Sequence, residues 1–148
     1  MNTCGSGRGK GVAIFSRKKH NVLKMAKIDN SNYHLLHLEF HPISITVVYK
    51  PPDSKSSSDI ATDLKSILTK DKTSVVCGDF NIDFNKCPDN SISNTLTEMG
   101  FQQVISNSTH IEGSLLDHMY INTEQAMQFL HPLYFSDHDA TCLLVDIE

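Results

Sequence analysis

Residues 73–81, Thr-Ser-Val-Val-Cys-Gly-Asp-Phe-Asn, join a short apolar run to polar side chains at its end. A Val-rich run bounded by turn residues predicts a buried strand. If the backbone stays extended to Asn81, the period of two places Asp79 and Asn81 on one face and directs Phe80 into the core. A carboxylate and a carboxamide at a strand end can activate water or bind phosphate. The alternative is an Asx-rich turn that merely closes the strand.

The composition is that of an ordinary globular protein. A chain of 148 residues, 39% hydrophobic and 20% charged, suffices for one domain with a sizeable core. The formal net charge of −4 excludes a global positive field, so contact with nucleic acid requires a local patch. We find no signal peptide, lipidation motif or membrane-spanning run, and hence no expected membrane partner. The four cysteines form no C-x-x-C pair, which argues against zinc and favours the cytosol or nucleus.

Apolar periodicity predicts α/β layers with mixed strand directions rather than a doubly wound sheet. Besides the strand that ends near Gly78, we expect strands over residues 11–17, 22–28, 33–40, 43–49, 104–105, 115–121 and 141–147. We expect helices over residues 56–70 and 92–99, and a short one over 125–130. Residues 1–148 form a single predicted domain without an internal repeat, and residues 1–10 are expected to be flexible.

Further polar residues lie near predicted strand ends: Tyr49, Asp117 and the pair Asp137-His138. The runs that contain them occur in a fixed order: GVAIFSR (11–17), VYKPP (48–52), GDFN (78–81), TH-x-x-G-S-x-L-D-H (109–118) and SDHDA (136–140). Together these runs resemble the endonuclease/exonuclease/phosphatase superfamily. The nearest resemblance is to the apurinic-type endonuclease domains of LINE-like retrotransposons, and it extends over nearly the whole chain.

The resemblance implies a fold and an activity. The fold is a four-layered β-sandwich flanked by helices, of the deoxyribonuclease I-like type. The activity is divalent-metal-dependent hydrolysis of phosphodiester bonds in DNA. In it Asp79 would orient or deprotonate the attacking water, and Asn81 would hold that water and a phosphate oxygen. Tyr49 would donate a hydrogen bond to the scissile phosphate.

The resemblance also assigns roles in the C-terminal half of the chain. His138 would stabilise or protonate the phosphate in the transition state, and Asp117 would fix the tautomer of His138. Asp137 and Asp79 would bind Mg²⁺ or Mn²⁺. These roles are chemically coherent, because phosphodiester hydrolysis needs an activated nucleophile and stabilisation of charge on the phosphoryl oxygens. A hard, oxygen-bound cation supplies the second requirement.

One part of the family pattern is missing from the 148 residues. The resemblance implies an earlier strand that ends in Asn, and a Gln-Glu-Thr-like motif whose Glu is the principal metal ligand. The acidic residues before Tyr49 are Asp29 and Glu39, and neither lies in that context. We therefore expect the C-terminal two-thirds of the fold, with weak metal binding because carboxylate count sets the affinity for a hard cation.

A truncated sheet is expected to leave an open edge or an uncovered apolar face. Such a surface predicts self-association as a homodimer, in which one chain covers the other. A clean monomer in light scattering at micromolar concentration would contradict it.

Two other functions remain open at this point. One is a catalytically inactive, domesticated remnant that acts as a binding or oligomerisation module, and the other is a phosphatase for small phosphoesters. A metal site at His34, His37 and His41 is disfavoured, because residues i and i+3 of a strand face opposite ways. His110 and His118 are assigned to the surface, where one of them could line a nucleic-acid groove.

Overall fold

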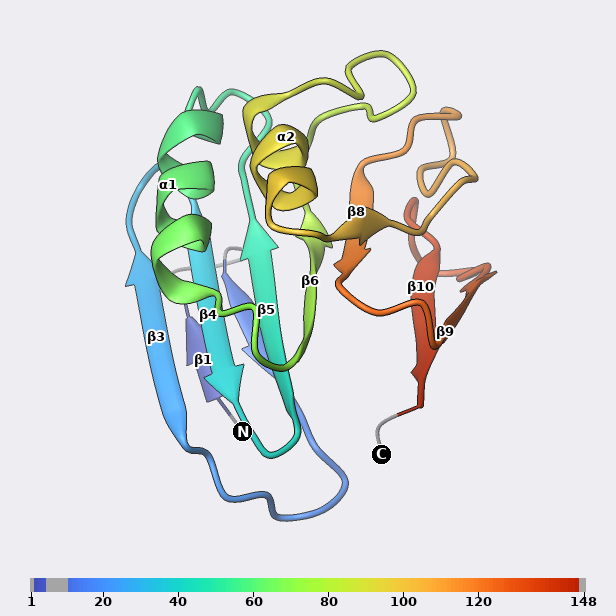
Figure 1. The fold of residues 1–148 in the computed structure, drawn as a ribbon. Helices are drawn as coiled ribbons and strands as arrows, with labels where there is room; N and C mark the ends of the chain where they lie inside the picture. The colour runs from blue at the N-terminus through green and yellow to red at the C-terminus, as the bar shows by residue number, and fades with distance from the viewer. Residues whose placement is uncertain (1, 5–10, 147–148) are drawn as a thin grey trace.

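The computed structural model describes residues 2–4 and 11–146 of the chain (Figure 1). Neither helix of the described part has the length and apolar character that a membrane span requires. In chain order the elements are β1 (Asn2–Cys4), β2 (Val12–Ile14), β3 (Lys24–Asp29), β4 (His34–Glu39), β5 (Ile43–Tyr49), α1 (Ser57–Ile67), β6 (Thr73–Asp79), α2 (Ser91–Glu98), β7 (Gln102–Gln103), β8 (Asp117–Ile121), β9 (Ala126–His131) and β10 (Ala140–Val145).

A six-stranded sheet in the order β3-β4-β5-β6-β8-β7 forms the centre of the molecule. The pair β5–β6 is parallel and is connected through α1, as a parallel pair requires a crossover, while the other pairs of this sheet are antiparallel. Both helices cover one face of the sheet (Figure 1). The core on that face combines Leu35, Val48 and Val76 of the sheet with Ile60, Leu64, Ile92 and Leu96 of the helices.

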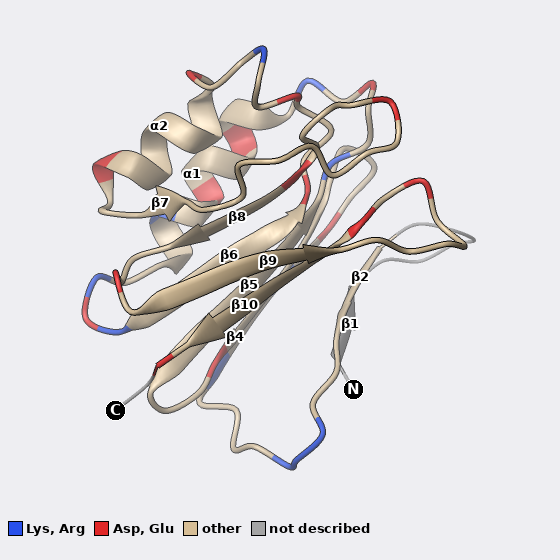
Figure 2. Cartoon of the chain, turned by 90° about the vertical axis from the view of Figure 1, so that its right-hand side faces the viewer, with Lys and Arg blue, Asp and Glu red and all other residues tan. Residues whose placement is uncertain are grey.

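Two small antiparallel sheets, β1–β2 and β9–β10, cover the other face (Figure 2). Leu130 and Leu143 of β9–β10 pack against Val75 and Ile121 of the central sheet. Val12 of β2 packs against β4. The molecule thus has helices, a mixed central sheet and a second strand layer, which confirms the expected layered α/β fold with mixed strand directions.

The predicted short helix over residues 125–130 is wrong, because this segment forms β9. Its residues pair with β10 in an antiparallel ladder that runs from Ala126–Val145 to His131–Ala140. Burial along β9 alternates, with Met127 and Phe129 exposed. Apolar residues on both faces of the strand hide the period of two, so the sequence pattern does not distinguish it from a helix.

Smaller differences concern strand bounds. The short strand expected at 104–105 lies two residues earlier, at β7, and the strand expected over 11–17 is confined to Val12–Ile14. Within the terminus expected to be flexible, Asn2–Cys4 forms β1 and pairs with β2. Residues 1 and 5–10, and residue 147 of the last predicted strand, lie outside the described part of the chain.

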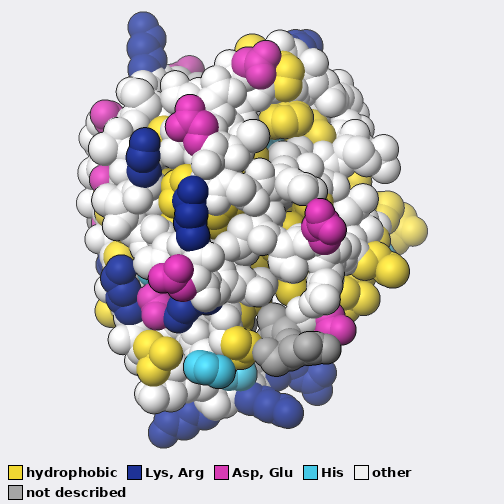
Figure 3. All heavy atoms as spheres, viewed as in Figure 1, with side chains coloured by type: hydrophobic (Ala, Val, Ile, Leu, Met, Phe, Trp, Pro, Cys, Tyr) yellow, Lys and Arg dark blue, Asp and Glu magenta, His cyan; other side chains and the backbone are white. Residues whose placement is uncertain are grey.

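An exposed apolar surface lies over β9 and β10. Hydrophobic side chains gather at the right-hand edge in Figure 3, on the side where Figure 1 draws these two strands. Met127, Phe129 and Leu144 are among the exposed large apolar residues of the described chain. They fit the expectation of an uncovered apolar surface, and the homodimer inferred from it stays a prediction.

Candidate active site

A row of polar side chains crosses one end of the central sheet. The strand registers pair Asp29 with His34, His34 with Tyr49, Tyr49 with Asp79, and Asp79 with Asp117. Side chains of paired residues lie on the same face of a sheet. For Asp79 this is the face away from the helices, because Val76, three residues earlier, packs in the core on the helix side. The row therefore brings three predicted site residues together and adds Asp29 and His34.

The turn after β6 joins Asn81 to Asp79. The strand ends at Asp79, and Asn81 has a left-handed φ of 46°, so the expectation of an extended backbone through Asn81 is wrong. The two side chains still meet: Asn81 N–H donates to Asp79 Oδ1 at 3.0 Å, and Asn81 Nδ2 donates to Asp79 Oδ2 at 3.1 Å. Asn81 Nδ2 also donates to Lys50 O at 2.8 Å. The amide therefore offers its acceptor Oδ1 to a ligand, while Phe80 is buried as predicted.

Gly78 allows β5 and β6 to approach closely just before Asp79. Its φ is +142°, a conformation that side-chain-bearing residues rarely adopt. A Cβ at this position would lie 1.8 Å from Val48 O and within 3 Å of two further backbone atoms of Val48. The absence of a side chain at Gly78 thus sets the spacing between the strand ends that carry Tyr49 and Asp79.

Asp117 and His138 form a hydrogen-bonded pair beside Asp79. His138 Nδ1–H donates to Asp117 Oδ2 at 2.6 Å. Thr109 Oγ1 accepts the Asp117 N–H at 3.0 Å and so fixes the backbone of β8 at this point. The carboxylate holds the imidazole in the Nδ1–H tautomer and leaves Nε2 for a ligand. Donor atoms of Asp79, Asp117 and His138 all lie within 4.8 Å of one another.

The environment raises the pKa values of both Asp79 and His138. Burial raises the pKa of Asp79, and the charge of Asp117 adds to this, against the hydrogen bonds from Asn81 and the charge of His138. Burial lowers the pKa of His138, but the hydrogen bond to Asp117 and the nearby carboxylates outweigh it and raise the pKa above the ordinary histidine value. Asp79 is therefore a stronger base, and His138 a weaker acid, than the free side chains.

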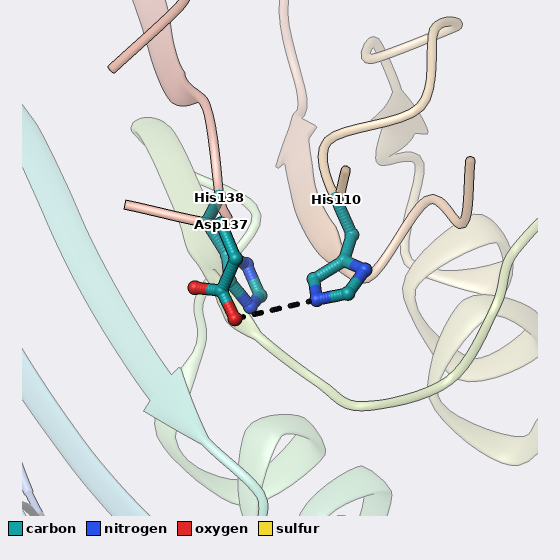
Figure 4. A group of neighbouring side chains, drawn as sticks. All are labelled: His110, Asp137 and His138. Atoms are coloured by element: carbon teal, nitrogen blue, oxygen red, sulfur yellow. Dashed lines mark ion pairs between the residues drawn. The ribbon is translucent and has the colours of Figure 1, made fainter. Parts of the chain in front are cut away.

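Asp137 belongs to a second group with His110 and His138, drawn in Figure 4. His110 Nε2 lies 3.6 Å from Asp137 Oδ2, and the Asp137 side chain is 69% exposed. His110 and His138 form a β-bridge, and their rings are 4.9 Å apart in an edge-to-face arrangement. The expected metal ligands Asp79 and Asp137 thus fall into two neighbouring groups that share His138.

Comparison with known proteins gives a likeness in structure alone, since no protein-family model and no curated protein matches the sequence. The endonuclease domain of TRAS1, a telomere-specific non-LTR retrotransposon, matches with a TM-score of 0.55 and 16% identity, over 80% of this chain and 65% of that one. An AP endonuclease from Archaeoglobus fulgidus matches with a TM-score of 0.63 and 14% identity, over 86% and 72%. An endonuclease/exonuclease/phosphatase family protein from Leptotrichia buccalis matches with a TM-score of 0.55 and 11% identity, over 86% and 62%.

The chain has the endonuclease/exonuclease/phosphatase fold. This confirms the fold expected from the sequence motifs. The chain spans 62% to 72% of the lengths of these three structures. At such low identities the likeness is one of fold, so the chemistry of the site rests on its own geometry.

Two histidines in this endonuclease/exonuclease/phosphatase fold differ from their expected surface positions. His110 belongs to the group around Asp137. The sequence feature that could have indicated this position is its place directly after Thr109 in the TH-x-x-G-S run. His118 is buried, stacks on Phe80 at 4.9 Å and contacts Ile82 O through Nε2 at 2.8 Å. Side chains alternate between the two faces of a strand, so His118 points into the core on the helix side while its neighbour Asp117 points to the other face.

Asp29 does not replace the metal-binding Glu of the family pattern. It lies on β3, three strands away from β6. With neighbouring strands about 4.8 Å apart, Asp29 is roughly 14 Å from Asp79 and cannot share an ion with it. Its side chain instead pairs with His34 Nδ1 at 2.8 Å, and the His34 ring stacks on Tyr49 with centroids 6.0 Å apart. Asp29 and His34 thus support the end of the row that carries Tyr49.

Proposed function

We propose that this chain is a divalent-metal-dependent endonuclease that hydrolyses phosphodiester bonds of DNA, and that it derives from a mobile element. The observation that carries the proposal is the placement of Asp79 beside the Asp117–His138 pair, with donor atoms within 4.8 Å of one another. Endonuclease neighbours of the same fold support it, and one of them is a retrotransposon endonuclease domain.

Asp79 and Asn81 are suited to activate water. The raised pKa of Asp79, which burial causes, makes its carboxylate a better proton acceptor than a free aspartate. Two hydrogen bonds from Asn81 fix the orientation of this carboxylate. Asn81 Oδ1 can accept a hydrogen bond from the same water and so align it for attack.

His138 and Tyr49 are suited to act on the phosphate. Because Nδ1–H of His138 is engaged by Asp117, Nε2 is the atom that reaches a ligand. As an imidazolium, His138 donates from Nε2 to a phosphoryl oxygen or to the leaving group and stabilises the charge that develops there. Tyr49, next to Asp79 in the row, donates its hydroxyl to a second phosphate oxygen.

The carboxylates near His138 fit a hard, hydrated cation. We propose Asp137 and Asp79 as the ligands of Mg²⁺ or Mn²⁺, because both offer oxygen atoms and Asp137 is largely exposed. His110 is a poor ligand in this geometry, since Glu112 N–H donates to its Nδ1 and Nε2 must then carry the proton. When bound, the ion would neutralise charge on the phosphoryl oxygens. Two carboxylates leave most positions to water, so the binding is weak.

Substitution of Asp137 by asparagine is expected to weaken Mn²⁺ binding about tenfold or more, because an exposed anionic ligand is lost. Electron paramagnetic resonance of free Mn²⁺ during a titration measures this without any reaction. Asp89→Asn, the same change at an exposed residue of the loop before α2, is the matched control and should leave the titration unchanged. Equal titrations of wild type and Asp137→Asn would remove Asp137 from the metal site.

The function itself is tested by offering two phosphoester substrates to the same protein. Supercoiled plasmid and p-nitrophenyl phosphate are each incubated with Mg²⁺, with Mn²⁺ and with EDTA. The proposal predicts nicking of the plasmid that requires metal, and little release of nitrophenol. Nitrophenol release without nicking would identify a phosphatase. DNA binding without cleavage of either substrate would identify the inactive module. The homodimer and a cytosolic or nuclear location stay predictions.

A further inference from the structure

Three large apolar side chains stand exposed at the candidate site: Ile111 at 82%, Tyr134 at 103% and Phe135 at 87%. We call them the apolar rim. Such exposure means that they add little to the stability of the fold. Tight turns favour Gly, Pro, Asn, Asp and Ser. The local backbone structure therefore does not explain why two adjacent aromatic residues occur at this position. Exposed apolar clusters of this kind mark surfaces that bind a ligand or partner.

The rim is presented by two defined turns. Ile111 is a central residue of the turn in which Gly113 N–H donates to His110 O at 2.9 Å. Tyr134 and Phe135 are the central residues of the turn in which Ser136 N–H donates to Leu133 O at 3.3 Å.

Backbone hydrogen bonds hold both turns against the candidate site. Ile111 N–H donates to Asp137 O at 2.9 Å, and Asp139 N–H donates to Thr109 O at 2.8 Å. The segments that carry the rim are therefore tied together on either side of His138, next to the hydrogen bond between His138 and Asp117. A substrate bound at His138 would therefore lie beside these turns.

The charges around the rim disfavour contact with a phosphate backbone. Glu112 shares a turn with Ile111, and Asp137 follows Phe135 by two residues. Lys50, the basic residue next to Tyr49, is buried, and its Nζ donates to Pro51 O at 3.2 Å. Arg17, Lys18 and Lys19 lie in the loop between β2 and β3, at the lower end of Figure 1, away from the strand ends that carry the site. The rim is thus apolar with acidic neighbours, so its contribution to binding must come from its aromatic rings and not from attraction of phosphates.

We propose that the apolar rim stacks against unpaired nucleobases next to the phosphodiester held at His138, so that the preferred substrate is single-stranded or locally opened DNA. The proposal rests on the proposed endonuclease function and names its substrate class. Aromatic side chains bind the π-faces of bases with little dependence on sequence. In a regular duplex these faces are stacked on neighbouring base pairs and are not available to Tyr134 and Phe135.

Binding in the absence of metal tests this inference. A fluorescein-labelled 15-nucleotide strand and the duplex of the same sequence are titrated by anisotropy in EDTA, so that no cleavage occurs. We expect tighter binding of the single strand. Tyr134→Ser and Phe135→Ser are each expected to weaken that binding about 5- to 150-fold, the range for the loss of one aromatic stack. The variants Tyr134→Phe and Phe135→Tyr should bind like wild type, because both keep the ring.

The matched control is the double variant Met127→Ser/Leu144→Ser. These residues form an exposed apolar cross-strand pair on β9 and β10, outside the rim. The control should leave single-strand binding unchanged. Equal affinity for strand and duplex, or unchanged binding by the Tyr134 and Phe135 serine variants, would overturn the proposal. If those variants abolish self-association instead, the rim is a contact between copies of this chain, and the proposal is likewise wrong.

Nicking assays separate this inference from the proposed function. If nicking depends on metal and the rim variants bind the single strand like wild type, the stacking role of the rim is wrong and the proposed endonuclease function stands. Rim-dependent single-strand binding without nicking of any substrate rejects the endonuclease, and with it the placement of a reacting phosphodiester beside the rim.

Discussion

Replacement of Asp117 by asparagine is expected to lower the rate of plasmid nicking about 10²–10⁴-fold, the range for loss of general acid–base catalysis. The carboxylate of Asp117 accepts the His138 Nδ1–H at 2.6 Å. An asparagine carries no charge, so it cannot stabilise the imidazolium form of His138, which is the form that donates from Nε2. Asp117 is a positioning residue, since it acts through His138. The rate is measured from the conversion of supercoiled to open-circular plasmid.

The pH profile distinguishes this role from a general loss of structure. Asp117 raises the pKa of His138, and the acid form of His138 is present below that pKa and lost above it. Removal of the Asp117 charge should therefore move the alkaline limb of the residual activity to lower pH. Asp71→Asn makes the same change in the exposed loop at the other end of β6 and should alter neither rate nor profile. An unshifted alkaline limb in Asp117→Asn would contradict the assignment.

Replacement of Gly78 by alanine is expected to prevent stable folding. The added Cβ would lie 1.8 Å from Val48 O, and the atoms that it meets are backbone atoms, which no side-chain rotation can relieve. Either β5 and β6 separate where Tyr49 pairs with Asp79, or the strand rotates out of register. We expect a loss above about 4 kcal/mol in the free energy of unfolding, a large part of the 5–15 kcal/mol typical of a domain. Urea denaturation followed by circular dichroism measures it.

Gly113→Ala separates the clash from backbone strain. Gly113 also has a positive φ, +85°, but a Cβ built there has no neighbour within 4 Å. This variant should lose only about 1 kcal/mol, the cost of a left-handed conformation in a residue with a side chain. Similar stabilities for the two alanine variants would show that β5 and β6 can move apart at Gly78.

The motif-rich strands could be predicted from the sequence, whereas β9 could not. Residues 73–81 combine a β-branched run with a glycine and two polar residues, so local pattern and tertiary role agree. In β9, Met127 and Phe129 face solvent, and the period of two is masked. What makes β9 a strand is its ladder with β10, and such non-local pairing leaves no trace in a local window.

The residues of the candidate site could be singled out one by one in the sequence, but their arrangement could not be predicted. Asp79, Asp117 and His138 stand out through their motifs, and the structure brings them together. The neighbours Asp29 and His34 could not be found in the same way, because they join the row only through the registers of β3, β4 and β5. His110 depends likewise on the bridge that places it opposite His138.

Nicking of supercoiled plasmid by wild type, Asp79→Ala and His138→Ala, each in Mg²⁺, Mn²⁺ and EDTA, tests the central claim most directly. His131→Ala, at the exposed end of β9, controls for loss of a histidine. The account predicts metal-dependent nicking by wild type and His131→Ala, lowered about 10²–10⁴-fold in both site variants. Nicking that survives both substitutions, or no nicking by the wild type, would contradict it.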